Sequence, residues 1–330
     1  MNSKLETLIR QATQAKTIHK TEEIQALWSG YGDISRYQLT GCKRKSVVVK
    51  NVQLPDEVNH PRGWHSDLSH QRKIRSYHVE SAWYRFFAEL CNDHCRVPEY
   101  LALEERENKF LIVLEDLNES GFSEQKDTAS IEEMTVCLRW LANFHATFMG
   151  KKTVSLWEVG SYWHLATRPD ELEALSDLPL KIAADKIDKT LQDCPYQTLV
   201  HGDAKLANFC FSEDGQQVAA VDFQYVGGGV GMKDVAYFIG SCLKEEACEF
   251  NESHLLDIYF EELQKALKTR QKEINAQAVE DAWRALFPWA WTDFHRFIKG
   301  WSPEHWKIHS YSERLAHQVI DELKLTNKLK

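Results

Sequence analysis

The character of the chain changes near residue 117, and no other feature limits its fold as strongly. Before this point, short β-prone runs are separated by glycine turns, as in residues 24–39 and 46–52. Beyond it, apolar residues recur every three or four positions, most clearly from Ile131 to Phe148. The contrast predicts an α+β fold, in which a small antiparallel sheet and a larger, mostly helical region occupy separate parts of the chain.

This change divides the chain into two lobes, residues 1–117 and residues 118–330. Apolar spacing predicts that the first lobe begins with a helix within the first twenty residues, ahead of the antiparallel strands. Its later elements are expected to be a polar, basic loop at 60–73, a helix at about 74–91 and a buried strand at 110–114. The first lobe is therefore expected to be built on a sheet and the second on helices.

Composition narrows the classes of function. Lys and Arg number 40 and Asp and Glu 49, so the net charge is −9. An acidic surface argues against binding to nucleic acids or anionic membranes, since both need an excess of cations. No apolar run approaches the roughly 18 residues of a membrane span, and no obligate protein partner is implied. With eight scattered cysteines and no signal peptide, we expect a cytoplasmic protein with reduced thiols.

The most informative stretch of the sequence is residues 199–224. An apolar strand ends there, a polar turn containing Asp203 follows, and two β-prone runs around Ser-Glu-Asp-Gly predict a hairpin. Asn208 stands just before the first hairpin strand and Asp222 just after the second. The hairpin should therefore bring Asn208 and Asp222 close together, with Asp203 five residues before Asn208 in the preceding loop.

These three residues suit one kind of chemistry. A carboxylate and an amide oxygen are ligands for hard cations such as Mg²⁺, and Asp203 would remain free to accept a proton. Phosphoryl transfer to an alcohol needs metal ions that neutralise the phosphates and a carboxylate that orients the hydroxyl. The alternative is that Asp203 and His201 merely close a loop while Asp222 caps a turn. The combination at these spacings favours the catalytic interpretation.

The pattern His201-Gly202-Asp203-x4-Asn208, followed by Asp222-Phe223, resembles the catalytic and metal loops of the protein-kinase-like phosphotransferases. Glycine at 202, where protein kinases carry arginine, is similar to the small-molecule branch, which includes aminoglycoside phosphotransferases and choline kinases. Val-Asp-Phe-Gln at 221–224 is most similar to the ecdysteroid-kinase-like (CHK-like) members. The segments 141–146, 228–229 and 233–237 fit the same pattern, so the resemblance covers roughly residues 24–300.

This resemblance implies a two-lobed protein-kinase-like fold and an enzyme that uses ATP and Mg²⁺. Asp203 would be the catalytic base, with Asn208 and Asp222 as the magnesium ligands. His201 is expected to brace its loop rather than transfer protons. Asp234 is expected to tie down the catalytic loop. By this reading residues 1–117 form the nucleotide-binding lobe, and residues 118–330 hold the catalytic loop and the acceptor site.

The resemblance also points to Lys50, at the end of a β-branched run, as the lysine that contacts the α- and β-phosphates. Its partner should be an acid on the following helix, and Glu80 is the first choice with Glu89 as the second. The plainer alternatives are a solvated lysine at a strand edge and an ordinary surface acid. Residue order and separation favour the Lys50–Glu80 pair.

Two further segments are assigned to the nucleotide. The sequence has no Gly-x-Gly-x-x-Gly, but the turn with Gly30 and Gly32 can offer backbone amides to phosphates. A plain hairpin turn explains these glycines nearly as well. Glu115 and Leu117 fall where the family has its hinge, at which backbone groups would meet the edge of the adenine. There the path of the chain matters more than the side chains.

Aromatic residues crowd the last part of the chain, where this branch generally holds its acceptor. The members of this group are Trp283, Phe287, Trp289, Trp291, Phe294, Phe297, Trp301 and Trp306. With Asp293 among them, they would suit a cationic or flat apolar alcohol. Aromatic residues at helical spacing are, however, more often core. The basic loop (His60, Arg62, His65, His70, Arg72, Lys73) is a second place for phosphates or an anionic acceptor, or else a solvated connector.

Three functions remain. The first is an active small-molecule kinase of ecdysteroid-kinase-like type, with choline- or aminoglycoside-type acceptors as the next possibility. The second is a non-catalytic kinase-like nucleotide-binding module, which the presence of Asp203, Asn208 and Asp222 disfavours. The third is a protein kinase, which Gly202 and the short stretch from Asp222 to Asp234 disfavour. The expected partners are ATP and a small-molecule alcohol, whose identity the sequence leaves open, as it does the choice between ATP and GTP.

Overall fold

The computed structural model describes residues 3–27, 30–54, 67–106 and 109–328. Contacts divide the chain into two compact units, Met1–Gln125 with Cys210–Val221, and Lys126–Phe209 with Asp222–Lys330. The first unit contains a five-stranded antiparallel sheet and the second consists mainly of helices. The predicted α+β class is therefore confirmed.

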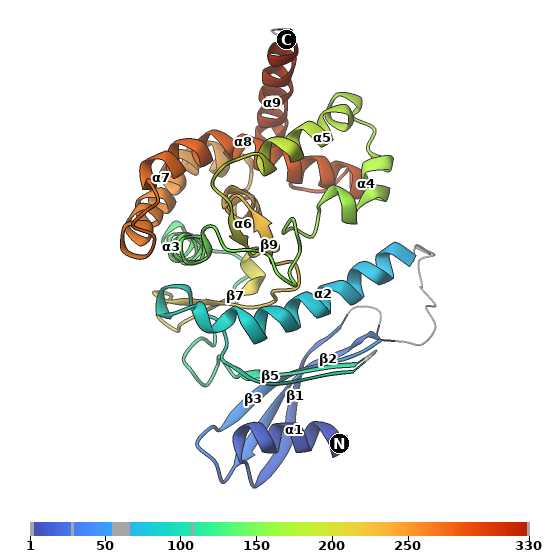
Figure 1. The fold of residues 1–330 in the computed structure, drawn as a ribbon, viewed down its shortest axis with the longest axis vertical. Helices are drawn as coiled ribbons and strands as arrows, with labels where there is room; N and C mark the ends of the chain where they lie inside the picture. The colour runs from blue at the N-terminus through green and yellow to red at the C-terminus, as the bar shows by residue number, and fades with distance from the viewer. Residues whose placement is uncertain (1–2, 28–29, 55–66, 107–108, 329–330) are drawn as a thin grey trace. The chain divides into compact units, whose positions relative to one another are not determined.

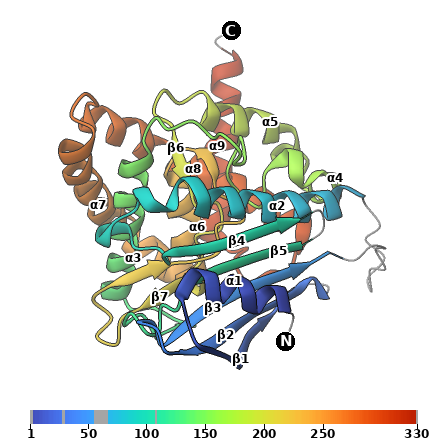
Figure 2. The same cartoon turned by 60° about the horizontal axis from the view of Figure 1, so that its bottom comes forward.

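The sheet of the first unit has the strand order β1-β2-β3-β5-β4 (Figure 2). Its strands are β1 Thr17–Ala26, β2 Gly32–Thr40, β3 Ser46–Gln53, β4 Tyr100–Arg106 and β5 Lys109–Glu115. Strands β2, β3 and β5 confirm the predicted runs. The prediction placed the start of β1 too late and missed β4. Both are edge strands whose side chains are largely exposed or half-buried, so neither carries a clear apolar alternation.

Helices α1 (Ser3–Thr13) and α2 (Asp67–Phe86) lie on opposite faces of this sheet (Figure 1). Side chains alternate along β3, so Val49 packs in the core with α1 while Val52 packs with Tyr77 of α2. Lys50 shares the face of Val52 by the same alternation. The strand pattern thus points Lys50 toward α2.

Helix α2 begins earlier than the sequence indicated. The prediction placed residues 67–73 in a basic loop, but they form the first two turns of the helix. Leu68 is the one apolar side chain of this segment and it is exposed, so no apolar stripe marks the helical period there. His60, Arg62 and His65 of the predicted loop lie outside the described residues. After α2 the chain forms two short 3-10 turns, η2 Ala88–Leu90 and η3 Asp93–Cys95.

The predicted hairpin forms from β7 (Phe209–Phe211) and β8 (Val218–Ala220). It belongs to the first unit, although its sequence lies in the second half of the chain. A small core of Leu117, Phe122, Cys210 and Ala219 joins it to the segment that follows β5. Asn208 and Asp222 are therefore the residues at which the chain enters and leaves this hairpin.

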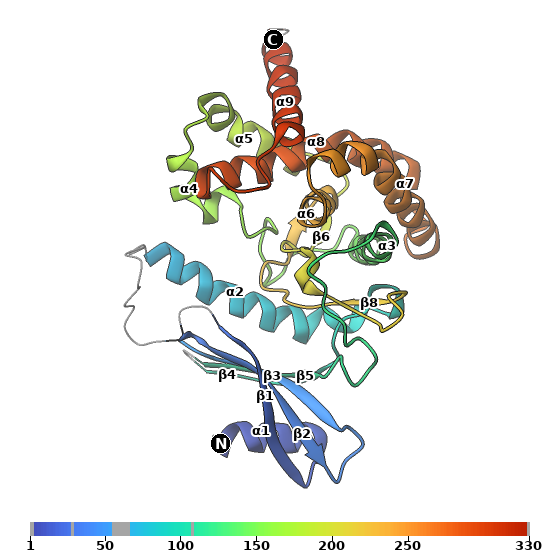
Figure 3. The ribbon, with the colours of Figure 1, turned by 180° about the vertical axis from the view of Figure 1, so that it is seen from behind.

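The second unit is a helical assembly around α6. Its helices are α3 Ile131–Phe148, α4 Pro169–Ala174, α5 Leu178–Gln192, α6 Met232–Cys242, α7 Glu245–Arg270, α8 Ala276–Trp301 and α9 Ser310–Lys328, with 3-10 turns η4 Leu165–Thr167 and η5 Leu206–Asn208. Helix α3 has its predicted bounds and begins with a capping box. It packs along α7, while α6 packs on α8 (Figure 3). The short strands β6 Thr198–Val200 and β9 Gly227–Gly229 pair antiparallel.

Within the described ranges, no helix combines the length and the apolar character that a membrane crossing requires.

Candidate active site

The loop after β6 is held by a single buried carboxylate. Asp234, in the first turn of α6, accepts the backbone N–H of His201 at 2.6 Å and that of Gly202 at 2.9 Å. Its Oδ2 also lies 3.1 Å from Nε2 of His145, whose other ring nitrogen lies 2.8 Å from the hydroxyl of Tyr259. Helices α3, α6 and α7 therefore fix the loop at the end of β6. The contacts match the bracing role expected for Asp234, and His145 is fully buried.

Gly202 is required by the shape of this loop. Its φ is +78°, in the left-handed region that favours glycine. A Cβ at this position would lie 2.1 Å from the carbonyl oxygen of Tyr225. The absence of a side chain thus lets the loop approach the segment after Asp222, and Asp203 follows directly.

Asp203 is buried, and its carboxylate accepts from Lys205 and Asn208, with the hydroxyl of Tyr237 also beside it. Its Oδ2 accepts from Nζ of Lys205 at 3.1 Å and from Nδ2 of Asn208 at 3.2 Å. The same Nδ2 of Asn208 donates to the carbonyl oxygen of Asp203 at 2.7 Å. Because the nitrogen of the Asn208 amide is engaged by Asp203, its oxygen is the atom left to face a cation.

Burial raises the pKa of Asp203, and the nearby charge of Asp222 adds to this effect. Lys205 and His201 act in the opposite direction without cancelling it. The same cluster raises the pKa of Lys205, where the charges of Asp203 and Asp222 outweigh burial. A carboxylate with a raised pKa is a stronger base, which is the property a proton acceptor needs.

Asp222 stands at a strained point of the backbone. Its φ is +67°, which is uncommon for a residue other than glycine. One carboxylate oxygen accepts from Nε2 of Gln224 at 2.5 Å. The next residue, Phe223, places its ring 4.6 Å from that of His201, and this contact braces the loop. Strain of this kind is typical of functional positions.

The oxygen atoms around this loop fit a magnesium ion. Asp203 and Asp222 are close enough for their charges to oppose each other, and a cation would relieve that opposition. The described residues contain no cluster of three or more His, Cys, Asp or Glu side chains with metal-binding geometry. Two carboxylates and an amide oxygen suit Mg²⁺ all the same, because it is usually held by one or two carboxylates together with substrate phosphates.

In the first unit, the structure brings Lys50 and Glu80 together. Nζ of Lys50 lies 2.7 Å from Oε2 and 3.0 Å from Oε1 of Glu80, and both residues are buried. Nζ also lies 5.8 Å from the centre of the Tyr77 ring. Glu89, the second choice, is exposed in the 3-10 turn after α2. The expected ion pair thus exists, and its role toward phosphates stays a prediction.

Gly30 and Gly32 form the turn between β1 and β2. Gly32 has a φ of +131°, and a Cβ there would lie 1.9 Å from the carbonyl oxygen of Asn51. Gly30 has a φ of +73°, and its N–H donates to the carbonyl of Leu27 at 3.2 Å. Ser29 lies outside the described residues. Both glycines are therefore needed by the turn itself, and contact with phosphates stays a prediction.

Glu115 and Leu117 are both engaged in the fold of the first unit. The Glu115 carboxylate accepts from Arg96 at 2.5 Å and from the N–H of Glu99 at 2.8 Å. Burial alone would raise the pKa of Glu115, but Ser120 and these donors hold it below its usual value. Leu117 is buried, and its carbonyl accepts from the N–H of Ser120 and of Phe122. A contact with adenine at these positions stays a prediction.

Sequence reasoning missed three residues beside Asp203: Tyr162, Tyr237 and Lys307. Burial, and next the charge of Asp203, raises the pKa of both tyrosines. Burial lowers the pKa of Lys307 to about 8, and the charge of Asp203 acts against this. One feature of the sequence could have identified Tyr237, because this residue lies one helical turn after Asp234. Tyr162 and Lys307 lie in loops, where no such feature marks them.

Tyr162 and Tyr237 are part of an aromatic cluster, which we call the ring cluster. Its members are Tyr162, Trp163, Tyr237, Phe294 and Phe297. Ring centres within it lie as close as 4.9 Å, between Tyr237 and Phe294. Trp283, Phe287 and Trp291 of the predicted aromatic group are instead buried core residues of α8. The core alternative therefore holds for part of that group, while Phe294 and Phe297 reach the ring cluster.

For Asp293 the core alternative holds, and not the one in which it faces a cationic acceptor. Asp293 is fully buried and accepts from Arg296 at 2.9 Å and from Nε1 of Trp163 at 2.9 Å. Nζ of Lys233 lies 3.3 Å away. Burial alone would raise the pKa of Asp293, but Lys233 and Arg296 hold it well below its usual range. Helical spacing could not show this, because the compensating cations come from α6 and from one turn further along α8.

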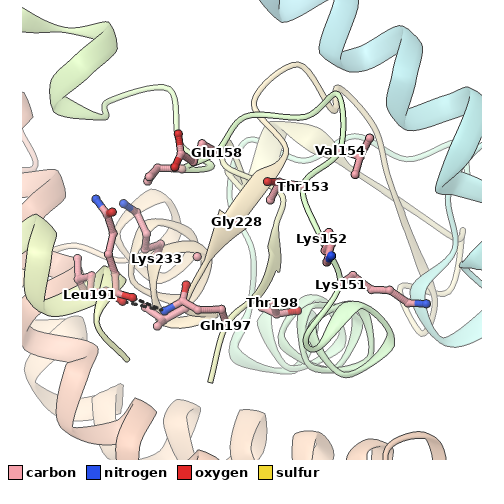
Figure 4. A pocket seen from close by; sticks show the side chains of 14 residues that line it. Lys151, Lys152, Thr153, Val154, Glu158, Leu191, Gln197, Thr198, Gly228 and Lys233 are labelled. Carbon is pink, nitrogen blue, oxygen red and sulfur yellow. Dashed lines mark hydrogen bonds between the residues drawn. The ribbon is translucent and has the colours of Figure 1, made fainter. Parts of the chain in front are cut away.

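A cavity of ≈ 510 Å³ opens beside β9 in the second unit (Figure 4). Gly228, Lys233, Thr198 and Gln197 contribute to its wall, and Gln197 donates to the carbonyl of Leu191 there. Asp203, Asn208 and Asp222 are not part of the lining. This cavity is therefore separate from the candidate site around Asp203.

Residues 41–155 and 161–272 match the family model described as Ecdysteroid kinase-like family. No curated protein sequence matches. The solved structure of a microcompartment-associated aminopropanol kinase is similar with a TM-score of 0.50 and 14% identity, over 96% of this chain and 93% of that chain. The crystal structure of an aminoglycoside-3'-phosphotransferase of type VIII is similar with a TM-score of 0.47 and 13% identity, over 89% of this chain and 98% of that chain. The first of these likenesses shows a shared fold.

Proposed function

Because the chain belongs to the ecdysteroid kinase-like family of small-molecule kinases, we propose that it transfers the γ-phosphate of ATP to a hydroxyl group of a small molecule. The observation that carries this proposal is the geometry of Asp203. Its carboxylate is buried and held by Lys205 and Asn208, on a loop that Asp234 ties to α6. Such a preorganised base is what the acceptor hydroxyl needs.

In the proposed reaction, Asp203 orients the acceptor hydroxyl and takes its proton. The hydroxyl oxygen forms a bond to the γ-phosphorus, and the bond from that phosphorus to the β,γ-bridging oxygen breaks, so that ADP leaves. Lys205, 3.1 Å from the Asp203 carboxylate, would place a positive charge beside the transferred group. Positioning and electrostatic stabilisation supply most of the catalysis in reactions of this class.

We assign the magnesium ligands to Asn208, through its amide oxygen, and to Asp222. When bound, Mg²⁺ would neutralise charge on the phosphate oxygens. The donor set supports this assignment, since it combines hard oxygen atoms with two carboxylates whose charges oppose each other. We assign His201 to the shape of the loop, through the contact of its Nδ1 with the N–H of Asp203 at 3.3 Å and its ring contact with Phe223.

On the nucleotide side, we assign Lys50 to the α- and β-phosphates and Glu80 to the orientation of Lys50. The buried ion pair supports this role, because a lysine held in one position presents its charge without further ordering. The turn with Gly30 and Gly32 would lie against the phosphates, and the backbone from Glu115 to Leu117 against the adenine. We expect the enzyme to work in the cytoplasm.

The test of this function is the Asp203→Asn variant. It should lower kcat by about 10²–10⁴-fold, because the amide cannot accept the proton, and it should leave the Kd for ATP unchanged. ADP release and formation of a phosphate monoester, followed by ³¹P NMR, would be measured over a panel of sterols, choline analogues, aminoglycosides and sugars. Asp321→Asn, an exposed carboxylate on α9, is the matched control.

Two results would count against the proposal. A normal kcat in Asp203→Asn would remove Asp203 as the base. Binding of ATP without phosphate transfer to any alcohol of the panel would favour the alternative, a nucleotide-binding module without catalysis.

A further inference from the structure

The ring cluster beside Asp203 is already covered by cations of the protein itself. Nζ of Lys307 lies 5.0 Å from the ring centre of Tyr237 and 5.3 Å from that of Phe294. Within the part of the chain that the structure describes, the contacts of the Lys307 ammonium group are with aromatic rings, and it forms no ion pair with a carboxylate. Its ammonium group therefore rests on aromatic faces with no carboxylate partner of its own, and the charge of Asp203 still acts on it.

The remaining rings of the cluster are covered in the same way. The guanidinium of Arg168 lies 5.7 Å from the ring centre of Tyr162 and 5.5 Å from that of Phe297. Lys233 lies 5.9 Å from the ring centre of Trp163. Each of the five rings thus has a protein cation within the distance at which cations and aromatic faces attract. A cationic acceptor would meet like charges at each ring instead of open faces.

The acidic side chains next to the ring cluster are compensated as well. The carboxylate of Asp293 forms ion pairs with two cations, Lys233 and Arg296. Glu171 pairs with Arg168 at 3.2 Å. Neither carboxylate is left for an amine of the substrate, because three cations (Arg168, Lys233, Arg296) face two carboxylates (Glu171, Asp293), which leaves one positive charge in excess. The field at the cluster therefore favours an anion.

Building on the proposed kinase function, we propose that the acceptor is an apolar hydroxyl compound carrying an anionic group, such as a carboxylate, and that Lys307 binds this anion while Asp203 meets the hydroxyl. Tyr162, the half-buried member of the ring cluster, would contact the apolar body between the two polar ends. Half-exposed Trp306, whose ring centre lies 5.5 Å from Nζ of Lys307, would border the anion. Because Lys307 is poorly solvated, which lowers its pKa, it gains more from an anion than a surface lysine would.

Three compounds that differ only in charge test this inference. All carry a hydroxymethylbiphenyl scaffold, and the far ring bears a carboxylate, a carboxamide or an aminomethyl group. Calorimetric titration of the full chain should give a Kd for the carboxylate at least about tenfold lower than for the carboxamide, and the weakest binding for the amine. Lys307→Met should abolish this preference. Lys307→Arg should retain it.

Methionine has nearly the length of lysine and carries no charge that burial would penalise. The Lys307→Met variant should therefore fold as the wild type does, which thermal unfolding would verify. Lys272→Met is the matched control, since Lys272 is exposed in the turn between α7 and α8. The inference is overturned if the wild type binds the carboxylate no better than the carboxamide, or if the preference survives in Lys307→Met. Absence of binding for all three compounds would overturn it too.

Adding MgATP to the same mixtures separates this inference from the kinase function. A carboxylate preference without any phosphate monoester would leave the anion site standing and refute the kinase. Phosphorylation of all three compounds at equal kcat/KM would refute the anion site and leave the kinase standing.

Discussion

At the scale of single residues, Asp203 combines two opposite influences. Lys205 and Asn208 stabilise its charged form, yet burial and Asp222 keep the pKa of Asp203 above its ordinary value. The residue is thus fixed in place by its donors without losing its basicity. Burial has the larger effect on the pKa of Asp203, because the free energy lost when a carboxylate leaves water exceeds what hydrogen bonds from Lys205 and Asn208 recover.

This balance predicts the pH dependence of catalysis. A base works only when deprotonated, so the raised pKa of Asp203 should place the acidic fall of kcat/KM at a pH above the ordinary carboxyl value of 3.8. Lys205→Met should move that fall to still higher pH, because Lys205 lowers the pKa of Asp203. The pH profile of kcat/KM for wild type and variant measures both. A midpoint at or below 3.8, or a downward shift in Lys205→Met, would contradict the assignment.

At the scale of elements, the shape of the catalytic loop, which follows β6, depends on its contacts with the segment before β9 and with α6. Gly202 has to pass the carbonyl of Tyr225 with no side chain, and Asp234 then holds the backbone of His201 and Gly202 from α6. The loop geometry is therefore set by backbone contacts between elements more than by the side chains of the loop itself.

Gly202→Ala is expected to deform this loop. The added Cβ would meet a backbone oxygen at 2.1 Å, so the segment has to shift, and the positive φ adds strain. Together these effects should cost about 2–5 kcal/mol of unfolding free energy and lower kcat sharply, since Asp203 moves with its neighbour. Urea unfolding and steady-state kinetics measure both.

Gly150→Ala is the control for that experiment. Gly150 has a φ of +73°, but nothing lies within 4 Å of a Cβ built there. The Gly150→Ala substitution should lower the unfolding free energy only by the backbone strain, about 1–2 kcal/mol, and leave kcat unchanged. Equal effects of the two substitutions would show that the approach to Tyr225 has no special role.

At the scale of the whole molecule, the residues assigned to the nucleotide and those assigned to the base and the metal belong to two different units. Lys50 and Glu80 belong to the first unit, and Asp203, Asn208 and Asp222 to the second. A ligand that binds the folded chain stabilises it in proportion to the logarithm of its concentration over Kd. Stabilisation by nucleotide and by metal therefore reports on the two sets of residues separately.

We expect MgATP at 100 times its Kd to add about 2.7 kcal/mol to the unfolding free energy. In Asp222→Ala the part of this stabilisation that requires Mg²⁺ should be lost, because a metal ligand is missing, while ATP alone should act as in the wild type. Thermal unfolding with ATP, with and without Mg²⁺, measures the difference. Full magnesium-dependent stabilisation in Asp222→Ala would remove this residue from the metal site.

Much of the fold could be predicted from local patterns. Helix α3, the strands β2, β3 and β5, and the β7–β8 hairpin all show a clear apolar period or a turn signal, and the structure confirms them. The edge strand β4 and the first turns of α2 escaped prediction, because their side chains are mostly polar or half-exposed and show no period. Local patterning reveals an element only where one of its faces is buried.

The same division holds for the candidate site. By itself, the sequence determined the candidate residues for the proposed chemistry, since the spacing from His201 to Asp222 lies within one loop and one hairpin. Only the tertiary structure decided the surroundings: Glu80 rather than Glu89 beside Lys50, Asp293 neutralised by Lys233 and Arg296, and Lys307 on the ring cluster. These partners come from elements far apart in the chain, and the balance of charges around a buried group depends on all its neighbours in space.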